Sequence, residues 1–397
     1  MLDAIYIHIP FCNTLCNYCD FLSFCNTTKD ERKKYVDYLI KEINMYTDKN
    51  KTQNLKVDSN LNTNLNSESS VEFDTVYFGG GTPSILDPED LKRILDVLNI
   101  KEGCEITLEV NPKSVDFNKL KKFRDIGINR LSIGIQSFND EKLKVLGRAH
   151  KSFEGEQCYL DAREAGFKNI SLDLIFSLPD QTLEGLEQDL EKLFSLEPEH
   201  FSIYSLIWEE GTPFYEDLKK GILKESDNDL EAEMFNLIIE KSKKKMYNHY
   251  EVSNFAKKNY ESRHNTKYWK NSEYLGIGLG ASGYIDNLRY KNFSDFQEYY
   301  MYIDSNKKPV DPDEIEIVDA ELKEVYRNIL GLRLLQEGVT PSEKYFEKFK
   351  KLEEEGFLKK VGNASEELGV NENSEVIRYI LTEKGLLLAN DVFQELI

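Results

Sequence analysis

The stretch Tyr6-Ile-His-Ile-Pro-Phe-Cys12-Asn-Thr-Leu-Cys16-Asn-Tyr-Cys19-Asp-Phe21 places three cysteines within eight residues, directly after a short strand-like segment. Thiolates are the soft ligands that iron–sulfur clusters take. A closed structural site needs four ligands, so three thiolates leave one iron open to an exchangeable ligand. The spacing therefore predicts a 4Fe–4S cluster on Cys12, Cys16 and Cys19. The amino and carboxylate groups of S-adenosylmethionine (SAM) can chelate the open iron.

A zinc site or a chance group of thiols fits this cysteine stretch less well. Zinc needs a fourth nearby ligand, whereas His8 lies on the preceding strand and Cys25 lies six residues beyond Cys19, outside the spacing. A chance group of buried thiols does not account for this density. Cys104 and Cys158, in contrast, are isolated in strand-like and helix-like patterns and are expected to be core residues.

The composition is typical of a globular chain. Hydrophobic residues make up 40% of the 397 residues and charged residues 31%, which suits one large domain and a smaller one. With 71 acidic and 51 basic side chains, the formal net charge is −20. Such a surface repels nucleic-acid phosphates and anionic lipid, so neither nucleic acid nor a membrane surface is expected as a main partner.

The N-terminal sequence predicts a cytoplasmic location. Met1 runs almost directly into the strand-like segment, so no signal peptide is expected, and no apolar run approaches the length of a membrane span. Thiols stay reduced in the cytoplasm, where a cysteine cluster indicates a metal site rather than disulfides.

Short apolar runs alternate with longer amphipathic ones over the first two thirds of the chain. The runs rich in β-branched and aromatic residues are typical of strands: Ala4–Ile9, Asp74–Phe78, Glu105–Val110, Arg130–Ile135, Ile170–Leu174 and Phe201–Leu206. Helical patterns lie between them: Glu31–Tyr46, Pro88–Leu98, Phe117–Ile126, Phe153–Ala165 and Leu183–Phe194. This order predicts an α/β fold with a parallel sheet and right-handed crossovers. The pattern alone does not separate a partial barrel from a doubly wound sheet.

An insertion at residues 48–71 interrupts this alternation. Its central part, Lys49–Ser70, is rich in Asn, Ser, Thr and Lys and has no face that could pack. A mobile surface insertion is therefore expected, with a partner-binding loop as the alternative.

The last part of the chain, residues 311–397, predicts a smaller domain after a first domain of residues 1–310. Amphipathic helices are expected at Ile317–Leu335 and Pro341–Glu355, followed by a strand at Arg378–Leu381 and a last helix. This order suggests a winged-helix-like α+β domain. Many winged helices bind DNA, but the many acids and the lack of a basic stripe favour a packing or partner-docking role here.

The cysteine stretch is the signature of the radical SAM superfamily, and five further motifs narrow the resemblance. They are Phe78-Gly79-Gly80-Gly81-Thr82-Pro83-Ser84, Glu109-Val-Asn-Pro112, Arg130-Leu-Ser-Ile-Gly-Ile-Gln136-Ser-Phe138, Gly147-Arg148-Ala-His150 and Asp173-Leu-Ile-Phe-Ser-Leu-Pro179. Together they resemble the family of oxygen-independent coproporphyrinogen III oxidase and its haem-chaperone relatives, over essentially the whole chain. The resemblance implies a partial (β/α)6 radical SAM barrel that carries a 4Fe–4S cluster and SAM.

Within this group the sequence is similar to the HemW haem chaperones. The oxidases carry a fourth cysteine two positions after the third, where this chain has Phe21, and they have a long extension before the cluster, where this chain has only a few residues. The stretch His264-Asn265-Thr-Lys-Tyr268-Trp269 matches the HNxxYW motif associated with haem handling in HemW proteins.

The resemblance also assigns residues to the cofactors. Those assigned to SAM are Gly79, Gly80, Gly81, Thr82, Glu109, Gln136, Arg148 and Asp173, with Tyr6 and Tyr18 flanking the cluster and SAM. The glycines let the backbone approach the methionyl amine of SAM closely, because no side chain intervenes. The acidic and polar residues lie at or just beyond strand ends, where α/β ligand sites are built. A surface ion pair is the alternative for Glu109 or Arg148, and a core position for either tyrosine.

His264 is the candidate haem ligand. A neutral imidazole is a standard axial ligand of haem iron, and Tyr268 would share its face of a helix. The alternative is a histidine in a polar loop, bonded to the backbone. The following Gly276-Ile-Gly-Leu-Gly280-Ala-Ser-Gly283 lacks the frame of a nucleotide loop and is interpreted as a glycine-rich turn lining the site.

Three functions stay open at this point. The resemblance favours a haem chaperone that binds haem and passes it to acceptor proteins such as respiratory enzymes, meeting membranes only through those acceptors. The alternatives are the radical decarboxylation of coproporphyrinogen III and a radical SAM reaction on another substrate. Phe21 and His264 favour the chaperone, and the acidic chain offers few obvious cations for the propionates of an oxidase substrate.

Overall fold

The computed structural model describes residues 2–47, 71–362 and 377–397, so most of the expected insertion at 48–71 lies outside the described residues. The chain divides into two compact units, one of Met1–Met234 with Glu273–Ile317 and one of Phe235–Ser272 with Val318–Ile397. The sequence suggested a single boundary near residue 310. This grouping differs because a segment from the middle of the chain joins the C-terminal residues.

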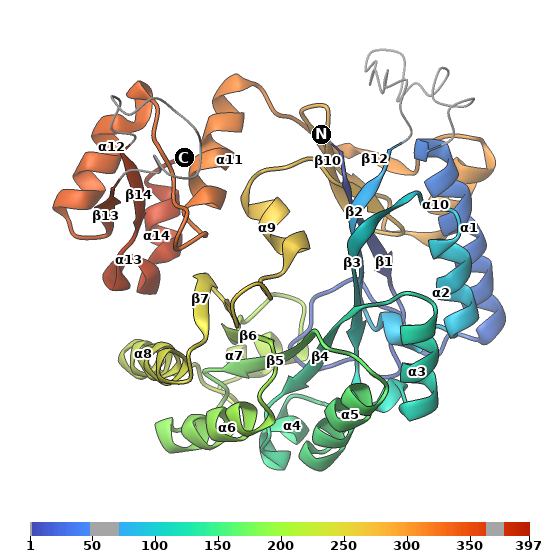
Figure 1. Ribbon diagram of the computed structural model, residues 1–397, viewed down its shortest axis with the longest axis horizontal. Coiled ribbons are helices and arrows are strands. Elements are labelled where there is room, and N and C mark those ends of the chain that lie inside the picture. The colour runs from blue at the N-terminus through green and yellow to red at the C-terminus, as the bar shows by residue number, and fades with distance from the viewer. Residues whose placement is uncertain (1, 48–70, 363–376) are drawn as a thin grey trace. The chain divides into compact units, whose positions relative to one another are not determined.

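A parallel sheet forms the core of the first unit (Figure 1). Its strands are β1 (Ala4–Ile9), β2 (Phe73–Gly80), β3 (Ile100–Val110), β4 (Arg130–Gln136), β5 (Ile170–Phe176), β6 (His200–Ser205) and β9 (Leu275–Ile277). They lie in the order β6-β5-β4-β3-β2-β1-β9, and each neighbouring pair is parallel. The first six follow one another without the reversal of strand order that defines a doubly wound sheet. The expected partial barrel is confirmed.

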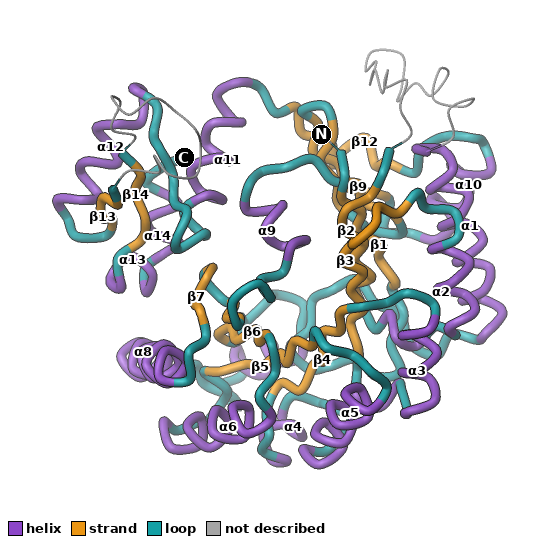
Figure 2. Tube along the Cα trace, viewed as in Figure 1, coloured by secondary structure: helices purple, strands orange, loops and turns teal. Residues whose placement is uncertain are grey.

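Helices cover the outer side of this curved sheet, as Figure 2 shows. They are α1 (Lys29–Thr47), α2 (Pro88–Leu95), α3 (Phe117–Asp125), α4 (Asp140–Val145), α5 (Ser152–Glu164) and α6 (Leu183–Leu196). The helix α2 illustrates the local cause. Pro88 at its first position presets the backbone angle, and Leu91, Ile94 and Leu95 recur at helical spacing and are buried.

The remaining elements of the first unit are short. Two 3-10 turns, η2 (Pro83–Ile85) and η3 (Pro112–Ser114), follow β2 and β3, and further along come α7 (Pro213–Lys219), β10 (Ser282–Ile285), β11 (Leu288–Asn292), α10 (Phe296–Asp304) and β12 (Val310–Ile317). The helix α8 (Asn228–Lys244) contains the border between the units. Strands β10, β11 and β12 form an antiparallel sheet.

The glycine-rich stretch at 276–283 is not the turn that the sequence suggested. Only its middle, around Gly278 and Gly280, is a turn, because its ends belong to β9 and β10. A Cβ atom on Gly276 would lie 1.9 Å from the carbonyl oxygen of Ser282. The glycine is therefore required by the close approach of two strands rather than by a ligand.

The second unit contains a β-hairpin, a short helix and the C-terminal elements. These are β7 (Asn248–Glu251), β8 (Asn254–Ala256), α9 (Arg263–Trp269), α11 (Ala320–Gly331), α12 (Glu343–Glu354), β13 (Leu358–Val361), β14 (Arg378–Leu381), α13 (Glu383–Leu387) and α14 (Ala389–Gln394). Two helices followed by the antiparallel pair β13–β14 give the winged-helix-like α+β arrangement expected from the sequence.

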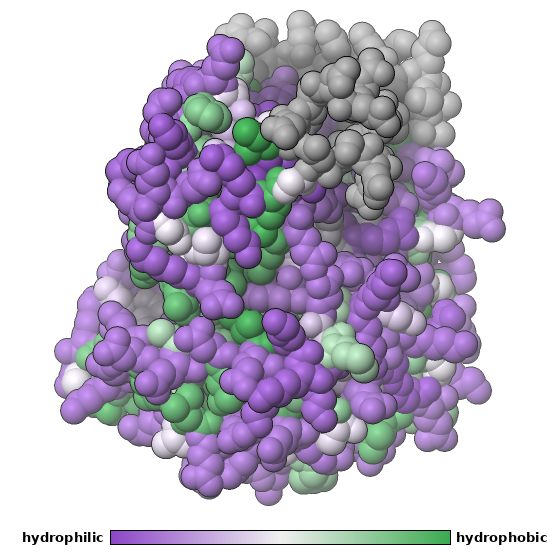
Figure 3. Space-filling view, turned by 60° about the vertical axis from the view of Figure 1, so that its left-hand side comes forward, coloured by the Kyte–Doolittle hydropathy of each residue, from purple (hydrophilic) through white to green (hydrophobic). Residues whose placement is uncertain are grey.

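The part of the surface that Figure 3 shows is mostly hydrophilic. Hydrophobic residues are scattered among the hydrophilic ones. In the described parts of the chain, no helix is both long enough and apolar enough to cross a membrane.

Candidate functional site

The loop that carries the three cysteines, residues 10–24, is anchored at its base and at its tip. At the base, Phe11 pairs with Phe24, and the amide of Cys12 donates to the carbonyl of Phe24 at 3.0 Å. At the tip, the Asn17 amide donates to the carbonyl of Leu146 at 3.0 Å, and its side-chain amide donates to Val145 at 2.9 Å. The backbone between these anchors therefore presents the thiols in a fixed frame.

The three thiols are free and partly buried, with polar neighbours. The Cys12 sulfur lies 3.4 Å from the Thr82 hydroxyl, and an Arg148 guanidinium nitrogen donates to the Cys16 sulfur at 3.5 Å. Burial raises the pKa of Cys12 and raises that of Cys19 to about 11. These two thiols keep their protons at neutral pH, so metal binding must displace them.

The donor set suits a 4Fe–4S cluster. All three donors are thiols of one anchored loop, and in such a cluster each thiolate would bind a different iron. A Cβ atom on Gly81 would lie 3.0 Å from the Cys12 sulfur, so the absence of a side chain there keeps the space beside this thiol open.

The glycine run lies at the carboxyl end of β2, next to β1. A Cβ atom on Gly79 would lie 2.7 Å from the Tyr6 ring, and one on Gly80 would lie 2.6 Å from the His8 ring. Gly80 also has a backbone angle φ of +111°, which residues other than glycine rarely adopt. Its amide donates to the Glu109 carboxylate at 3.2 Å. The close packing and the backbone angle both require glycine at position 80.

Gly80→Val is therefore expected to weaken SAM binding severely, because the new side chain meets His8 and strains the backbone. The electron paramagnetic resonance (EPR) spectrum of the reduced cluster, recorded with and without SAM, measures the effect. Gly127→Ala is the matched control, because Gly127 has a φ of +108° and its Cβ atom would meet no neighbour within 4 Å. A full SAM response in Gly80→Val would contradict the assignment of this loop.

Two carboxylates lie inside the barrel, on β3 and β5. Glu109 accepts from the Tyr77 hydroxyl at 2.9 Å as well as from Gly80, and Asp173 accepts from the hydroxyls of Ser132 at 2.8 Å and Ser171 at 2.9 Å. Burial and the nearby Asp173 raise the pKa of Glu109 to about 7, although its hydrogen bonds lower it. Burial also raises the pKa of Asp173. Both can accept hydrogen bonds from ligand hydroxyls or an amine.

Gln136 and Arg148 meet beside Gly134. A Cβ atom on Gly134 would lie 2.8 Å from the Gln136 side-chain nitrogen and 3.4 Å from an Arg148 guanidinium nitrogen, which itself donates to the Gly134 carbonyl at 2.7 Å. Gln136 adopts a φ of +67° at the end of β4. Among the described residues, Gln136 Oε1 and Arg148 Nε are buried without a hydrogen-bond partner. Such atoms are expected where a polar ligand completes the site.

The two tyrosines connect the cysteine loop to its surroundings. The Tyr6 hydroxyl lies 2.9 Å from His8 Nδ1, and His8 Nε2 lies 3.1 Å from the carbonyl of Leu22, in the cysteine loop. Tyr18 packs near the ring of Phe214, at 6.4 Å between centroids. Both tyrosines therefore support the loop, whatever else they contact.

A small cavity, partly open to solvent, lies beside the cysteine loop. It is lined by Asn13, Thr14, Cys16, Thr82, Asn111, Lys113, Gly147 and Ala149. The predicted residues Cys16 and Thr82 are thus brought together with Asn111, from the motif after β3, and with Gly147 and Ala149, from the motif after α4. Thr82 and Asn111 follow the carboxyl ends of two parallel strands, where α/β folds carry ligand sites.

Comparisons with known proteins identify the family. The radical SAM superfamily matches residues 6–193. The heme chaperone HemW of Bacillus subtilis (strain 168) is 36% identical, with 99% of this chain and 98% of that protein covered. The heme chaperone HemW of Lactococcus lactis is 35% identical, with 99% and 97% covered. The chain belongs to the HemW family.

A solved structure supports the fold of this HemW family member. The coproporphyrinogen III oxidase HemN of Escherichia coli superposes with a TM-score of 0.78 over 100% of this chain and 90% of that chain, at 20% sequence identity. At this identity the likeness concerns the fold alone. Membership of the radical SAM superfamily implies a 4Fe–4S cluster and SAM, which the three thiols and the unpaired polar atoms of the site fit.

The HemW motif around His264 lies in the second unit, whereas the other predicted site residues lie in the first. His264 is on α9 rather than in a loop, is 1% exposed, and its Nε2 lies 2.8 Å from the Tyr268 hydroxyl. The Arg333 guanidinium lies 4.3 Å from the centre of the Trp269 ring and 4.0 Å from the buried Glu251 carboxylate. The motif residues are therefore held by specific partners within this unit.

Of the residues that line the cavity, the sequence predicted only Cys16 and Thr82 as site residues. Five others belong to the motifs without having been assigned a role: Asn13, Thr14, Asn111, Gly147 and Ala149. Lys113 lies outside the motifs and was missed. Lys113 pairs with Glu154 of α5. A cation directly after a strand-end motif is the signal that could have identified it.

Proposed function

We propose that this chain is a haem chaperone that binds haem and delivers it to acceptor proteins, and that it carries a 4Fe–4S cluster and SAM. The observation that carries the proposal is the 36% identity to a heme chaperone HemW over 98% of that protein's length. Phe21 supports it, because this residue occupies the position two after Cys19, where the oxidases carry a fourth cysteine. The Phe21 side chain is 63% exposed. Respiratory enzymes are the proposed acceptors, and the proposed location is the cytoplasm.

The proposed site uses Cys12, Cys16 and Cys19 as cluster ligands. The bound cluster supplies an iron with an open coordination position. Arg148 places a positive charge beside the Cys16 sulfur, which offsets the negative charge of the thiolate.

The proposed SAM site is built around the open iron. The glycine run, with Thr82, would let the backbone reach the amine of SAM, and Arg148 would pair with its carboxylate. The carboxylates of Glu109 and Asp173 and the unpaired Gln136 Oε1 would accept hydrogen bonds from its hydroxyls and amine. Tyr6 and Tyr18 hold the cysteine loop against this site.

The proposed haem ligand is His264. Its Nε2 already contacts the Tyr268 hydroxyl, so ligation through this nitrogen requires the hydroxyl to leave. Burial of His264 in α9 means that haem entry also requires some movement of its surroundings.

His264→Ala is expected to lower haem affinity about tenfold or more, because an axial nitrogen is lost. Absorbance titration of haem, followed at the Soret band, measures this. Tyr268→Phe is the matched control, since it keeps the ring but removes the hydroxyl from Nε2, and we expect it to retain or strengthen binding. Unchanged affinity and an unchanged Soret band in His264→Ala would show that another residue binds the iron.

The proposed function is tested by anaerobic incubation of the reconstituted protein with haem and, separately, with coproporphyrinogen III. The chaperone should bind haem and leave coproporphyrinogen III unchanged. Conversion of coproporphyrinogen III to protoporphyrinogen IX with SAM consumption, and no haem binding, would overturn the proposal in favour of an oxidase.

A further inference from the structure

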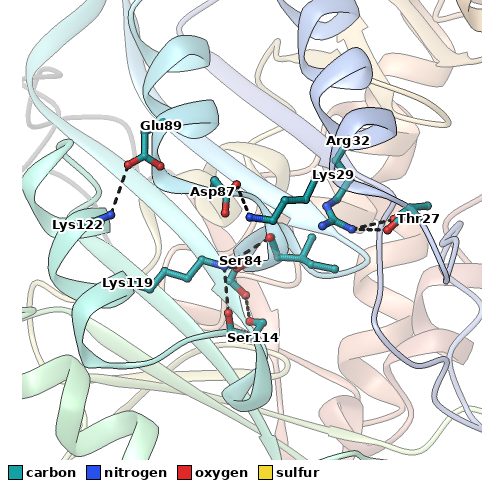
Figure 4. A network of polar contacts seen from close by, with 10 residues as sticks. Thr27, Lys29, Arg32, Ser84, Asp87, Glu89, Ser114, Lys119 and Lys122 are labelled. Carbon is teal, nitrogen blue, oxygen red and sulfur yellow. Dashed lines mark hydrogen bonds and ion pairs between the residues drawn. The ribbon is translucent and has the colours of Figure 1, made fainter.

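A half-buried lysine, which was not among the predicted site residues, binds the two loops that follow β2 and β3 and line the cavity. Lys119 lies in the first turn of α3, where its backbone amide is capped by the Asp116 carboxylate at 2.8 Å. Its ammonium reaches the turns after β2 and β3, where Ser84 and Ser114 lie, as Figure 4 shows. There it donates to the carbonyl oxygens of Ser84 at 2.7 Å, Ser114 at 3.1 Å and Ile85 at 3.4 Å.

The environment of this ammonium is unusual for a lysine. It has three N–H donors, and three backbone carbonyls meet them. The carboxylates of Asp87 and Asp116 act on it through their charge, but the hydrogen bonds of the ammonium go to these carbonyls. The carbonyls belong to the short turns η2 and η3. The lysine therefore serves the backbone and not a surface ion pair.

The two turns are also joined to each other by their serines. The hydroxyls of Ser84 and Ser114 lie 2.6 Å apart, and the amide of Asn111 donates to the Ser84 hydroxyl at 3.2 Å. Ser84 is fully buried. Together with the serines, Lys119 therefore links the loop after β2 to the loop after β3 and fixes the position of one relative to the other.

Both loops continue directly into the cavity beside the cysteines. Thr82, two residues before Ser84, and Asn111, three residues before Ser114, both line that cavity. Thr82 also contacts the Cys12 sulfur. The separation of these two cavity walls is set by the turns behind them, and the turns are held by Lys119.

We propose that Lys119 is a positioning residue for SAM binding, which fixes the spacing between the glycine loop after β2 and the loop after β3. This inference rests on the proposed function, because SAM is the ligand whose affinity it sets. The cysteine loop is anchored elsewhere, so the cluster itself does not depend on this lysine.

The test compares Lys119→Met with Lys122→Met in the full chain carrying its reconstituted cluster. Lys122 lies one turn further along α3 and makes only an exposed contact with Glu89 at 3.5 Å, which Figure 4 also shows. Iron content, melting temperature and the SAM concentration that half-saturates the EPR change are measured for each variant. Lys119→Met should weaken SAM affinity about tenfold with full iron content, because a charged hydrogen-bond network is lost.

Two further variants make the result decisive. Lys119→Arg keeps the charge and should restore most of the affinity, and Lys119→Gln, which offers fewer donors, should give an intermediate value. If Lys119→Met does not fold, Lys119→Gln is judged by the same criterion. Unchanged SAM affinity with a lowered melting temperature would show a merely structural tie and overturn the proposal. Lack of a SAM response in the wild type would refute the proposed function itself.

Discussion

Cys16→Ala is expected to abolish the iron–sulfur cluster. The anaerobically reconstituted wild type should hold about four irons per chain, with the absorbance and reduced EPR spectrum of a 4Fe–4S cluster. Cys16 lies in the middle of the anchored loop, and its sulfur contacts Arg148 at 3.5 Å. Removing one of three ligands leaves two irons without protein ligands, so we expect loss of the whole cluster rather than a partial loss. Iron analysis and the EPR spectrum provide the measurement.

Cys25→Ala is the control for this experiment. Cys25 is also partly buried and free, but it follows Phe24, which closes the loop by pairing with Phe11. The Cys25→Ala variant should therefore keep its cluster. A full cluster without Cys16 would contradict the ligand assignment. Loss of the cluster without Cys25 would mean a fourth protein ligand and no open iron.

Glu42→Ala is expected to give the largest loss of stability. Glu42, on α1, is fully buried and accepts from the Gly278 amide at 2.9 Å, the Asn292 side chain at 2.7 Å and the Tyr299 hydroxyl at 2.5 Å. Alanine would leave three buried donors without their acceptor, which we expect to cost roughly 4 kcal/mol. Chemical denaturation measures the unfolding free energy.

This network also bears on the site. Tyr35, on the same helix, donates to the carbonyl of His8 at 2.9 Å and accepts from the amide of Leu279 at 2.8 Å. It thereby ties the end of β1, just before the cysteine loop, to the turn after β9. A stability loss in Glu42→Ala of less than about 1 kcal/mol would contradict this account of the sheet edge.

The contribution of Glu42 to the unfolding free energy is expected to fall as the pH rises. Burial raises the pKa of Glu42 from its ordinary 4.5 to about 7 in the folded chain, although its hydrogen bonds lower it. A raised carboxyl pKa favours the fold at low pH, and this contribution is lost as the pH rises from about 4.5 through 7. Between pH 5 and 8 the wild type should lose roughly 2.5 kcal/mol relative to Glu42→Gln, which has no proton to lose. A constant difference between the two proteins would contradict the assignment.

Hydrophobic patterns predicted most of the barrel. The strand Ala4–Ile9 and the helix starts at Pro88 and Leu183 agree closely with the structure. The strand is a short apolar run that is buried at nearly every position, and the two helices bury side chains at helical spacing. The start of β3 was missed, since Lys101, Glu102 and Gly103 are exposed and polar, although they already extend the strand from Ile100. Strands β9 to β12 were missed because they are short and rich in glycine or charge.

Site residues could be predicted where they belong to a contiguous sequence motif. They could not be predicted where they act through contacts between segments that are distant in the sequence. The cysteines, the glycine run and the strand-end residues came from contiguous patterns. Lys119 could not be found in this way, because its partners Ser84 and Ser114 lie 35 and 5 residues away and offer backbone carbonyls that any residue has. The grouping of Phe235–Ser272 with the C-terminal residues likewise arises from contacts between distant segments.

Transfer of haem to a haem-free respiratory enzyme is the most direct test of the chaperone proposal. The protein, loaded with haem and carrying its cluster, is mixed with increasing concentrations of the acceptor, and the shift of the Soret band is followed with time. Direct delivery predicts a transfer rate that rises with acceptor concentration and exceeds the rate at which haem leaves the chaperone alone. A rate that does not change with acceptor concentration would mean that haem is simply released, and it would contradict the proposal.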